Sequence, residues 1–287
     1  MADFVSLRDS VEELVHDGDA VALEGFTHLI PFAAGHELVR QQRQGLTLIR
    51  MTPDIIYDQM IGMGCASRIV FSWGGNPGVG SLHRFRDAIE NGWPKPLDIE
   101  EHSHADMAAS YQAGASGLPF AVMRGYVGSD LPKYNKRIRP ITCPFTGEVL
   151  TATPALKPDV TIIHAQKADR KGNVAIFGIV GIQKEAALAA KKVIVTVEEV
   201  VDDLNAPVNA CVLPAWVISC ISVVPGGAHP SYAHGYYKRD NSFCKAWDII
   251  SRDRESFLVW MNRHVLGTKD FAEYRRSVDS EMKVGHA

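Results

Sequence analysis

The chain has 287 residues, of which 46% are hydrophobic and 22% are charged. This length and composition allow one large α/β domain with a buried core. The net charge of −3 gives no basic excess of the kind that binding to nucleic acid or to an anionic membrane surface requires.

The N-terminal residues and the cysteines indicate the cellular compartment in which the protein is expected. Acidic residues come early in "MADFVSLRDS", so this start is not typical of a signal peptide. No stretch approaches the roughly 20 consecutive apolar residues of a membrane-spanning helix. The five cysteines form no C-x-x-C pair and most lie in apolar runs, which indicates reduced, buried thiols. We therefore expect a cytoplasmic protein.

Helices and strands alternate along the first third of the chain. Apolar residues at helical spacing predict an amphipathic helix over 6–15, with Ser6 as its N-cap. A short apolar strand at 20–23 then runs into Gly25. Further helices are predicted over 32–42, 55–62 and 82–90, and further strands over 46–51 and 68–73.

The same alternation continues after residue 150. Strands are predicted over 155–165, 191–201 and 210–224, with an alanine-rich helix over 184–191. The stretch 132–154 is expected to be a loop-dense excursion, and residues 245–278 are expected to be helical. The pattern predicts one domain, 1–287, with an open, mostly parallel sheet covered by helices on both faces. Ligands bind such sheets at the carboxyl ends of the strands.

The first candidate loop, "LEGFTHLIPF", follows the strand at 20–23. It contains Gly25, Phe26, Thr27 and His28, and Pro31 stands where the next helix can begin. Unpaired amides at that helix start could hold an anion or a developing oxyanion. The alternative is an ordinary connecting loop, and the local sequence does not decide between the two.

The second candidate loop, "WGGNPGVGS", follows the strand at 68–73. It lacks the full G-x-G-x-x-G spacing of a dinucleotide site. Glycines as dense as Gly74 and Gly75 indicate that the backbone closely approaches a ligand or another chain. A surface turn is the alternative. The side chains available to a phosphate or carboxylate are Asn76, Ser81, His83 and Arg84.

The third candidate, "EEHSHAD", is a dense group of acids and histidines at 100–106. An H-x-H pair supplies two zinc ligands at most, so we expect no metal site. The helix-forming residues that follow place Ser103 or His104 near a helix N-terminus, where a neutral histidine is favoured. A neutral histidine can hydrogen-bond a reacting carbonyl. A solvated helix cap is the alternative.

Seven blocks of the sequence resemble, in order, the α subunits of the two-subunit family I CoA-transferases. The blocks are "ALEGFTHLIPFAAGHE", "MTPDIIYD", "FSWGGNPGVGSLHR", "EEHSHADMAASYQAGASGLPFAV", "TCPFTGEVL", "DVTIIHAQKADRKGNV" and "GGAHPSYAHGYYKRDN". The resemblance implies an open α/β sheet of the ribose-phosphate-isomerase-like kind, in agreement with the predicted strands.

The resemblance also implies a reaction and a partner. CoA would pass from succinyl-CoA to 3-oxoadipate in the β-ketoadipate route of aromatic breakdown, with no permanently bound cofactor. The attacking glutamate belongs to the β subunit in an S-E-N-G motif, and "IENG" around Glu90 is expected to be only a helix end. The chain would be incomplete without a β subunit, in a heterodimer or heterotetramer, and its other partners would be acyl-CoA and small carboxylic acids.

Several residues take implied roles from this resemblance. The G-G-F loop of the relatives corresponds to Glu24-Gly25-Phe26, and a glutamine that binds the reacting carbonyl corresponds to His104. Glu101 could orient His102 or His104. The expected substrate-facing set is Gly25, Phe26, Thr27, His28, Gly74, Gly75, Asn76 and Ser103. Loops 74–80 and 232–237 are expected to contact the β subunit.

Three alternatives remain open beside this interpretation. The acceptor could be another short dicarboxylate such as glutaconate. The enzyme could be an acyl-CoA hydrolase or ring-opening enzyme that uses Glu101, because a shared fold does not determine function. A non-enzymatic sugar-phosphate-sensing domain is the third, and no DNA-binding helix pair or basic patch accompanies it.

Overall fold

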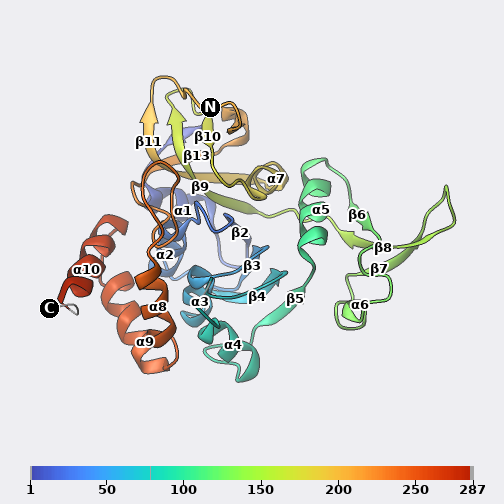
Figure 1. Ribbon diagram of the computed structural model, residues 1–287, viewed down its shortest axis with the longest axis horizontal. Helices are drawn as coiled ribbons and strands as arrows, with labels where there is room; N and C mark the ends of the chain where they lie inside the picture. Colours follow the sequence, from blue (N-terminus) through green and yellow to red (C-terminus); the bar gives the residue numbers. More distant parts are fainter. Residues whose placement is uncertain (1, 78, 285–287) are drawn as a thin grey trace.

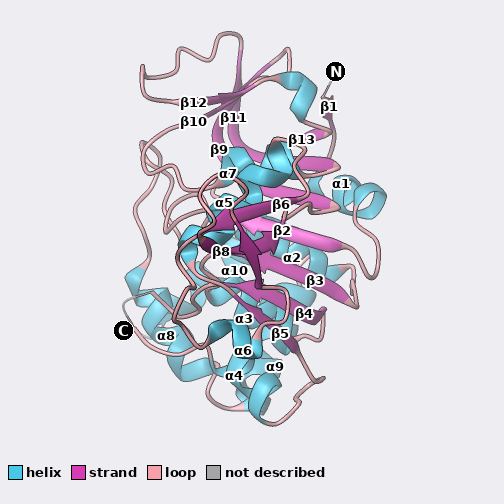
Figure 2. Cartoon of the chain, turned by 90° about the vertical axis from the view of Figure 1, so that its right-hand side faces the viewer, coloured by secondary structure: helices cyan, strands magenta, loops and turns pink. Residues whose placement is uncertain are grey.

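The computed structural model describes residues 2–77 and 79–284, and its main sheet is open and mostly parallel (Figures 1 and 2). Neighbouring strands along its main path pair in parallel, in agreement with the predicted fold class. In spatial order these strands are β1 (Asp3–Phe4), β13 (Cys220–Val223), β11 (Lys192–Val201), β9 (Val160–Asp169), β2 (Ala20–Glu24), β3 (Leu46–Arg50), β4 (Ala66–Phe71) and β5 (Asp98–Glu101). Two short strands, β10 (Val174–Ile176) and β12 (Cys211–Leu213), extend the sheet in antiparallel fashion from β9.

Alternate residues of the central strands face two different helical layers. Val21 and Leu23 of β2 belong to the larger apolar core, which also holds side chains of α1 (Leu7–Leu14), α2 (Phe32–Arg40), α3 (Ile55–Gly62) and α4 (His83–Glu90). Ala22 between them faces the opposite side. There it packs with residues of α5 (His104–Ala115) and α7 (Gln183–Ala189). Both faces of the parallel sheet are therefore covered.

The helix starts follow local capping chemistry. The Ser6 hydroxyl accepts a hydrogen bond from the Asp9 amide at the start of α1, as predicted. Glu90 is the last residue of α4 and pairs with Arg86, one turn earlier, at 2.8 Å. The "IENG" segment is thus a helix end, as expected.

The stretch 132–154 is less rich in loops than predicted, and this part of the prediction was wrong. It contains the short helix α6 (Leu131–Tyr134) and two strands, β7 (Arg139–Thr142) and β8 (Val149–Pro154), which form a small antiparallel sheet with β6 (Phe120–Met123). Figure 1 shows this sheet beyond α5, away from the main sheet. Pro140 lies on the edge strand β7, where a missing backbone donor costs little.

The single strand predicted over 210–224 is also wrong, because Pro214 divides it. Residues before the proline form β12, residues 215–217 form a 3₁₀ turn, and β13 begins only at Cys220. The helical prediction for 245–278 is confirmed by α8 (Asn241–Ile250), α9 (Arg254–Met261) and α10 (Phe271–Val284). Among the described residues, no helix combines the length and apolar character that crossing a bilayer requires.

Trp247 joins the C-terminal helix α8 to helix α3. Its indole is fully buried and donates a hydrogen bond to the Asp58 carboxylate of α3 at 3.0 Å. The same carboxylate accepts from the Arg84 and Phe85 amides and so caps α4. One buried carboxylate therefore joins α3, α4 and α8.

Replacement of Trp247 by Phe is expected to lower the free energy of unfolding by about 2–4 kcal/mol. The change leaves a cavity and removes one donor to Asp58. Urea unfolding followed by circular dichroism measures the loss. The control is Trp216→Phe, where the side chain is 79% exposed, and a change within about 0.5 kcal/mol is expected there. Equal losses at both positions would contradict the anchoring role of Trp247.

Candidate active site

The carboxyl ends of β2, β3, β4 and β5 meet at one edge of the sheet, because neighbouring strands pair in parallel. The loop after each strand begins at this edge. Polar groups of these loops are joined into a row by hydrogen bonds, from Gly25 at one end to His104 at the other. This row is the candidate active site.

Arg50 fixes the loop that follows β2. Its guanidinium is fully buried, pairs with both oxygens of Asp54 at 3.1 and 3.2 Å, and donates to the Gly25 carbonyl at 2.9 Å. A Cβ atom on Gly25 would lie 2.7 Å from the Leu29 carbonyl oxygen, so only glycine fits. Because a trans peptide holds its C=O and N–H on opposite sides, the Phe26 N–H points away from Arg50.

Glu24 is buried instead of lying in the open site. Its carboxylate accepts hydrogen bonds from the Tyr111 hydroxyl at 2.9 Å and the Met51 amide at 3.2 Å. Burial raises the pKa of Glu24 to about 7, although the nearby Arg50 charge acts in the opposite direction. Glu24 therefore supports the Met51 backbone and α5 from inside the protein.

Met51 connects Glu24 to Ser72 and His104. The Ser72 hydroxyl donates to the Met51 carbonyl at 2.6 Å, and the Ser72 oxygen lies 3.0 Å from His104 Nδ1. A hydroxyl has one proton, so Ser72 accepts from Nδ1–H. A neutral His104 then carries a lone pair on Nε2, and Nε2 donates only in the imidazolium form. His104 is exposed, which leaves Nε2 accessible.

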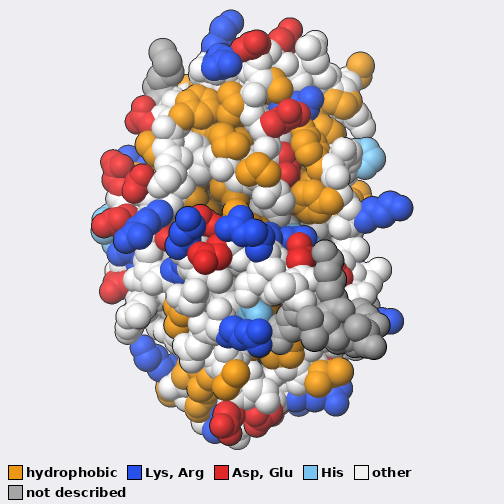
Figure 3. Space-filling view, turned by 90° about the vertical axis from the view of Figure 1, so that its left-hand side faces the viewer, with side chains coloured by type: hydrophobic (Ala, Val, Ile, Leu, Met, Phe, Trp, Pro, Cys, Tyr) orange, Lys and Arg blue, Asp and Glu red, His pale blue; other side chains and the backbone are white. Residues whose placement is uncertain are grey.

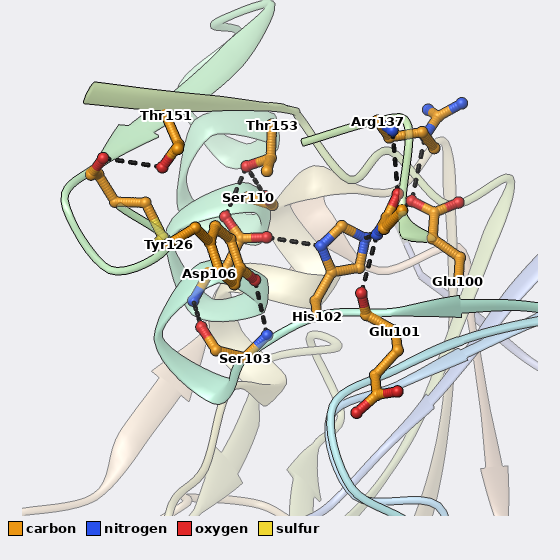
Figure 4. Close-up of polar contacts among 12 residues, drawn as sticks. Glu100, Glu101, His102, Ser103, Asp106, Ser110, Tyr126, Arg137, Thr151 and Thr153 are labelled. Atoms are coloured by element: carbon orange, nitrogen blue, oxygen red, sulfur yellow. Dashed lines mark hydrogen bonds and ion pairs between the residues drawn. The ribbon is translucent and has the colours of Figure 1, made fainter. Parts of the chain in front are cut away.

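The acidic group at 100–106 is a buried ion network built around His102 (Figure 4). Asp106 accepts from His102 Nδ1 at 2.6 Å, and Glu100 accepts from Nε2 at 2.8 Å. Arg68 and Arg137 pair with Glu100, and the Thr153 hydroxyl donates to Asp106 at 2.6 Å. The network ties β4, β5, α5 and the small sheet together.

The charges of this network reinforce one another. Burial lowers the pKa of His102, but the hydrogen bonds and charges of Asp106 and Glu100 outweigh it, and the pKa is raised. Burial raises the pKa of Glu100, but the His102 hydrogen bond and the Arg137 charge outweigh it, and the pKa is lowered. His102 is thus an imidazolium held between two carboxylates.

Glu101 does not orient either histidine, which corrects the sequence-based interpretation. Glu100 and Asp106 hold His102, and Ser72 holds His104. Successive side chains of a strand point to opposite sides, so Glu101 faces away from the His102 network. Figure 4 shows its carboxylate directed away from His102, and the side chain is exposed.

Ser103 is the N-cap of α5. Its hydroxyl accepts from the Asp106 amide at 3.1 Å, and its own amide donates to the Tyr126 hydroxyl at 2.7 Å. These contacts place Ser103 beside the site in a structural role.

His28 joins three loops from a buried position. Its Nε2 accepts from the His234 amide at 2.9 Å, so Nδ1 carries the proton that is donated to the Ile179 carbonyl at 3.1 Å. Burial lowers the pKa of His28 to about 4, which keeps this tautomer neutral. Thr27 beside it has a φ of 56°, a left-handed conformation that the surrounding loop contacts maintain. Neither ring nitrogen of His28 is available to a substrate.

Two groups expected to meet ligands are used inside the chain. The Asn76 amide donates to the Cys244 carbonyl of α8 at 2.8 Å, and Asn76 is buried. Near the start of α2, the Phe32 amide donates to the Ile30 carbonyl and the Ala33 amide donates to the Gly227 carbonyl. These two amides at the start of the helix are therefore not free to hold an anion. In this respect the segment is an ordinary connecting loop.

The glycine-rich loop approaches other parts of this chain. The Gly75 amide donates to the Pro53 carbonyl at 3.1 Å, and Gly74 lies against Phe85. His83 contacts Asp248, and Arg84 contacts Asp87 and the Arg252 carbonyl. Gly78, within the same loop, lies outside the described residues.

Sequence reasoning missed Arg50, Ser72 and Tyr111. Each of these residues follows or lies within an apolar run, and the spacing of the apolar residues there predicts that it belongs to the core. One signal was available: an arginine ending an apolar strand, with an acid four residues later, is the spacing of Arg50 and Asp54.

Both the sequence and the fold are similar to those of known proteins. Residues 4–223 match the family described as Coenzyme A transferase. The chain belongs to this family. The Acidaminococcus fermentans glutaconate coenzyme A-transferase structure superposes with a TM-score of 0.89 and 31% identity, over 96% of this chain and 93% of that chain.

The sequences of two relatives align with nearly the whole chain. A 3-oxoadipate CoA-transferase subunit of Pseudomonas knackmussii is 66% identical over 97% of this chain and 99% of its own length. The cholesterol ring-cleaving hydrolase IpdA subunit of Rhodococcus jostii is 25% identical over 96% of this chain and 95% of its own length. Proteins similar to this chain are thus named for different reactions.

The stability that His102 contributes should depend on pH. Its folded-state pKa is raised above the ordinary value of about 6.5, so the contribution is complete below about pH 6.5 and is lost as pH rises through the folded pKa. The difference in the free energy of unfolding between wild type and His102→Gln, measured in urea, is therefore expected to be largest below about pH 6.5 and to narrow as the pH is raised above it.

The control for this comparison is His16→Gln, because the His16 side chain is 68% exposed. A difference for His102→Gln that stays constant or widens with pH would show that His102 is not held as an imidazolium.

Proposed function

We propose that this chain is the α subunit of a two-subunit enzyme that transfers CoA from succinyl-CoA to 3-oxoadipate. The observation that carries the proposal is the 66% identity, over nearly all of both chains, to the Pseudomonas knackmussii 3-oxoadipate CoA-transferase subunit. The word subunit in that name supports a β-subunit partner. The β-ketoadipate pathway, a cytoplasmic location and a heterodimeric or heterotetrameric assembly belong to the same proposal.

The positions of three carboxylates of this chain support the proposal that the nucleophile lies on the partner subunit. Glu24 is 2% exposed and is hydrogen-bonded within the protein. Glu90 lies at the end of α4, paired with Arg86. Glu101 is exposed at the site, but within the described residues its carboxylate has no hydrogen bond to a base or donor, and only its carbonyl accepts from Asn135. A β-subunit glutamate facing the row from Gly25 to His104 would complete the site.

The proposed chemistry is a sequence of acyl transfers. The partner's carboxylate attacks the succinyl thioester and CoA thiolate leaves, which gives a mixed anhydride. The thiolate then attacks the glutamyl carbonyl, and succinate leaves. The acceptor carboxylate attacks this glutamyl thioester and expels the thiolate. Attack of the thiolate on the acceptor's acyl carbon forms the new acyl-CoA and restores the glutamate.

This chain's part is to stabilise charge and position carbonyls. The Phe26 N–H, fixed through the Arg50–Gly25 contact, is a preorganised donor at the strand end. His104, held by Ser72, lies at the opposite end of the row. Its Nε2 can accept a proton from a reacting acid or, as imidazolium, donate to a carbonyl oxygen. Thr27 belongs to the loop after β2, and Gly74 and Gly75 belong to the loop after β4.

The second candidate function is hydrolysis of an acyl-CoA or a ring-opening reaction. The exposed Glu101 carboxylate favours it, and a ring-cleaving hydrolase subunit is among the relatives. A water activated by Glu101 would release free CoA without a carboxylic acceptor.

Product analysis of the complex with its β subunit separates these functions. With succinyl-CoA and 3-oxoadipate, we expect 3-oxoadipyl-CoA and succinate in equal amounts, and slower transfer to glutaconate. Without an acceptor, we expect no sustained release of CoA. Steady CoA release without an acceptor would contradict the transferase proposal and support hydrolysis, and a preference for glutaconate would refute the acceptor assignment.

Replacement of His104 by Ala is expected to lower kcat by about 10- to 100-fold, because a positioned hydrogen-bonding group is lost at the reacting carbonyl. His104→Gln restores a donor and should recover much of the loss. Steady-state kinetics, with the yield of the two-subunit complex as a folding control, measure both variants. An unaltered kcat in His104→Ala would remove His104 from the site.

A further inference from the structure

A groove of about 780 Å³ lies between the loop after β13, the start of α8 and the first half of α10. Three cationic side chains line it: Lys238, Arg239 and Arg275. Figure 3 shows Lys and Arg side chains gathered in a band across the face that carries α10. The chain as a whole has a net charge of −3, so this concentration of positive charge is local.

Few negatively charged groups pair with these three cations. Arg239 donates to the Pro77 carbonyl, which is neutral. Arg275 pairs with Asp279 through Nη2 at 3.3 Å, while its buried Nη1 has no hydrogen-bond partner in the described part of the chain. Lys238 is exposed. A ligand with several anionic oxygens would pair with Lys238 and with the exposed part of the Arg275 side chain, which is 28% exposed.

The start of α8 adds neutral donors. Asn241 and Ser242 line the groove in the first turn of this ten-residue helix, whose N-terminus is positive. The one carboxylate in the lining, Asp240, is already engaged. It accepts from the Phe243 amide at 2.9 Å and from His229 Nε2 at 3.0 Å.

One wall of the groove belongs to a segment that contacts the loop after β2. This wall begins at Pro225 and Gly226, and the same segment reaches the loop after β2 through three hydrogen bonds. The Ser231 hydroxyl donates to the Thr27 carbonyl at 3.0 Å, the Leu29 amide to the Tyr232 carbonyl at 3.0 Å, and the Ala33 amide to the Gly227 carbonyl at 2.9 Å. The segment that forms this wall is therefore fixed to the loop that holds Phe26.

We infer that this groove binds phosphate groups and, resting on the proposed function, that they are those of the 3′-phospho-ADP end of CoA. The pantetheine arm separates these phosphates from the thioester, so a phosphate site must lie apart from the reacting carbonyl. Lys238 and Arg275 would pair with phosphate oxygens, and the α8 amides would add hydrogen bonds.

Kinetics with two acyl donors test this inference in the complex with the β subunit. Lys238→Met and Arg275→Met are each expected to raise KM for succinyl-CoA about 3- to 10-fold. For succinyl-pantetheine, which has no phosphate, the KM change should stay below about twofold. The matched controls are Lys245→Met on α8 and Arg276→Met on α10, which remove the same charge from exposed positions outside the groove lining.

Equal KM changes for both donors, or no change for either, would overturn the inference. Calorimetric titration with adenosine 3′,5′-bisphosphate tests the groove without any acyl transfer. Binding that weakens in the two groove variants and not in the controls supports it, and equal binding in all five proteins contradicts it. Inorganic phosphate that binds the groove while KM for succinyl-CoA stays unchanged in the variants would refute CoA as the source. An absence of transfer in the wild type would instead refute the proposed function.

Discussion

The buried ion pair between Arg50 and Asp54 is the constraint on which the candidate site depends. A fully buried guanidinium needs an opposite charge beside it. Arg50 pairs with both Asp54 oxygens, donates to the Gly25 carbonyl and lies 5.5 Å from the centre of the Tyr57 ring, while its Nε has no hydrogen-bond partner among the described residues. Asp54 also caps α3 through the Ile56 amide. One ion pair thus sets the start of a helix and the orientation of the Gly25–Phe26 peptide.

The rest of the row follows from this point by short contacts. Glu24 and Ser72 hold the Met51 backbone from two sides, and Ser72 determines which nitrogen of His104 carries a proton. The His102 network then holds the first turn of α5, on which His104 stands. The site's geometry is therefore built from buried charges behind the open edge, while the exposed groups are few.

Much of the fold was predictable because its signals are local. Apolar runs marked the central strands, and Ser6 capped its helix as its residue type indicates. The site was less predictable because its contacts join distant segments. Asn76 looked like a ligand group, but its partner, Cys244, is 168 residues away. Strand alternation alone could have shown that Glu100 and Glu101 point to opposite sides. The partners of Glu100 could not be predicted in this way, because Arg68 and Arg137 come from other elements.

Exposure of carboxylates separates the reactions that this fold could support. Glu24 is enclosed, whereas Glu101 is exposed and is the acid that the hydrolase alternative would use; the transferase account takes the attacking acid from the β subunit. Mass spectrometry of the two-subunit complex, treated with succinyl-CoA and then borohydride, tests this assignment directly. The account predicts one glutamate converted to its alcohol, in a peptide of the β subunit. A reduced acid in any peptide of this chain would contradict it.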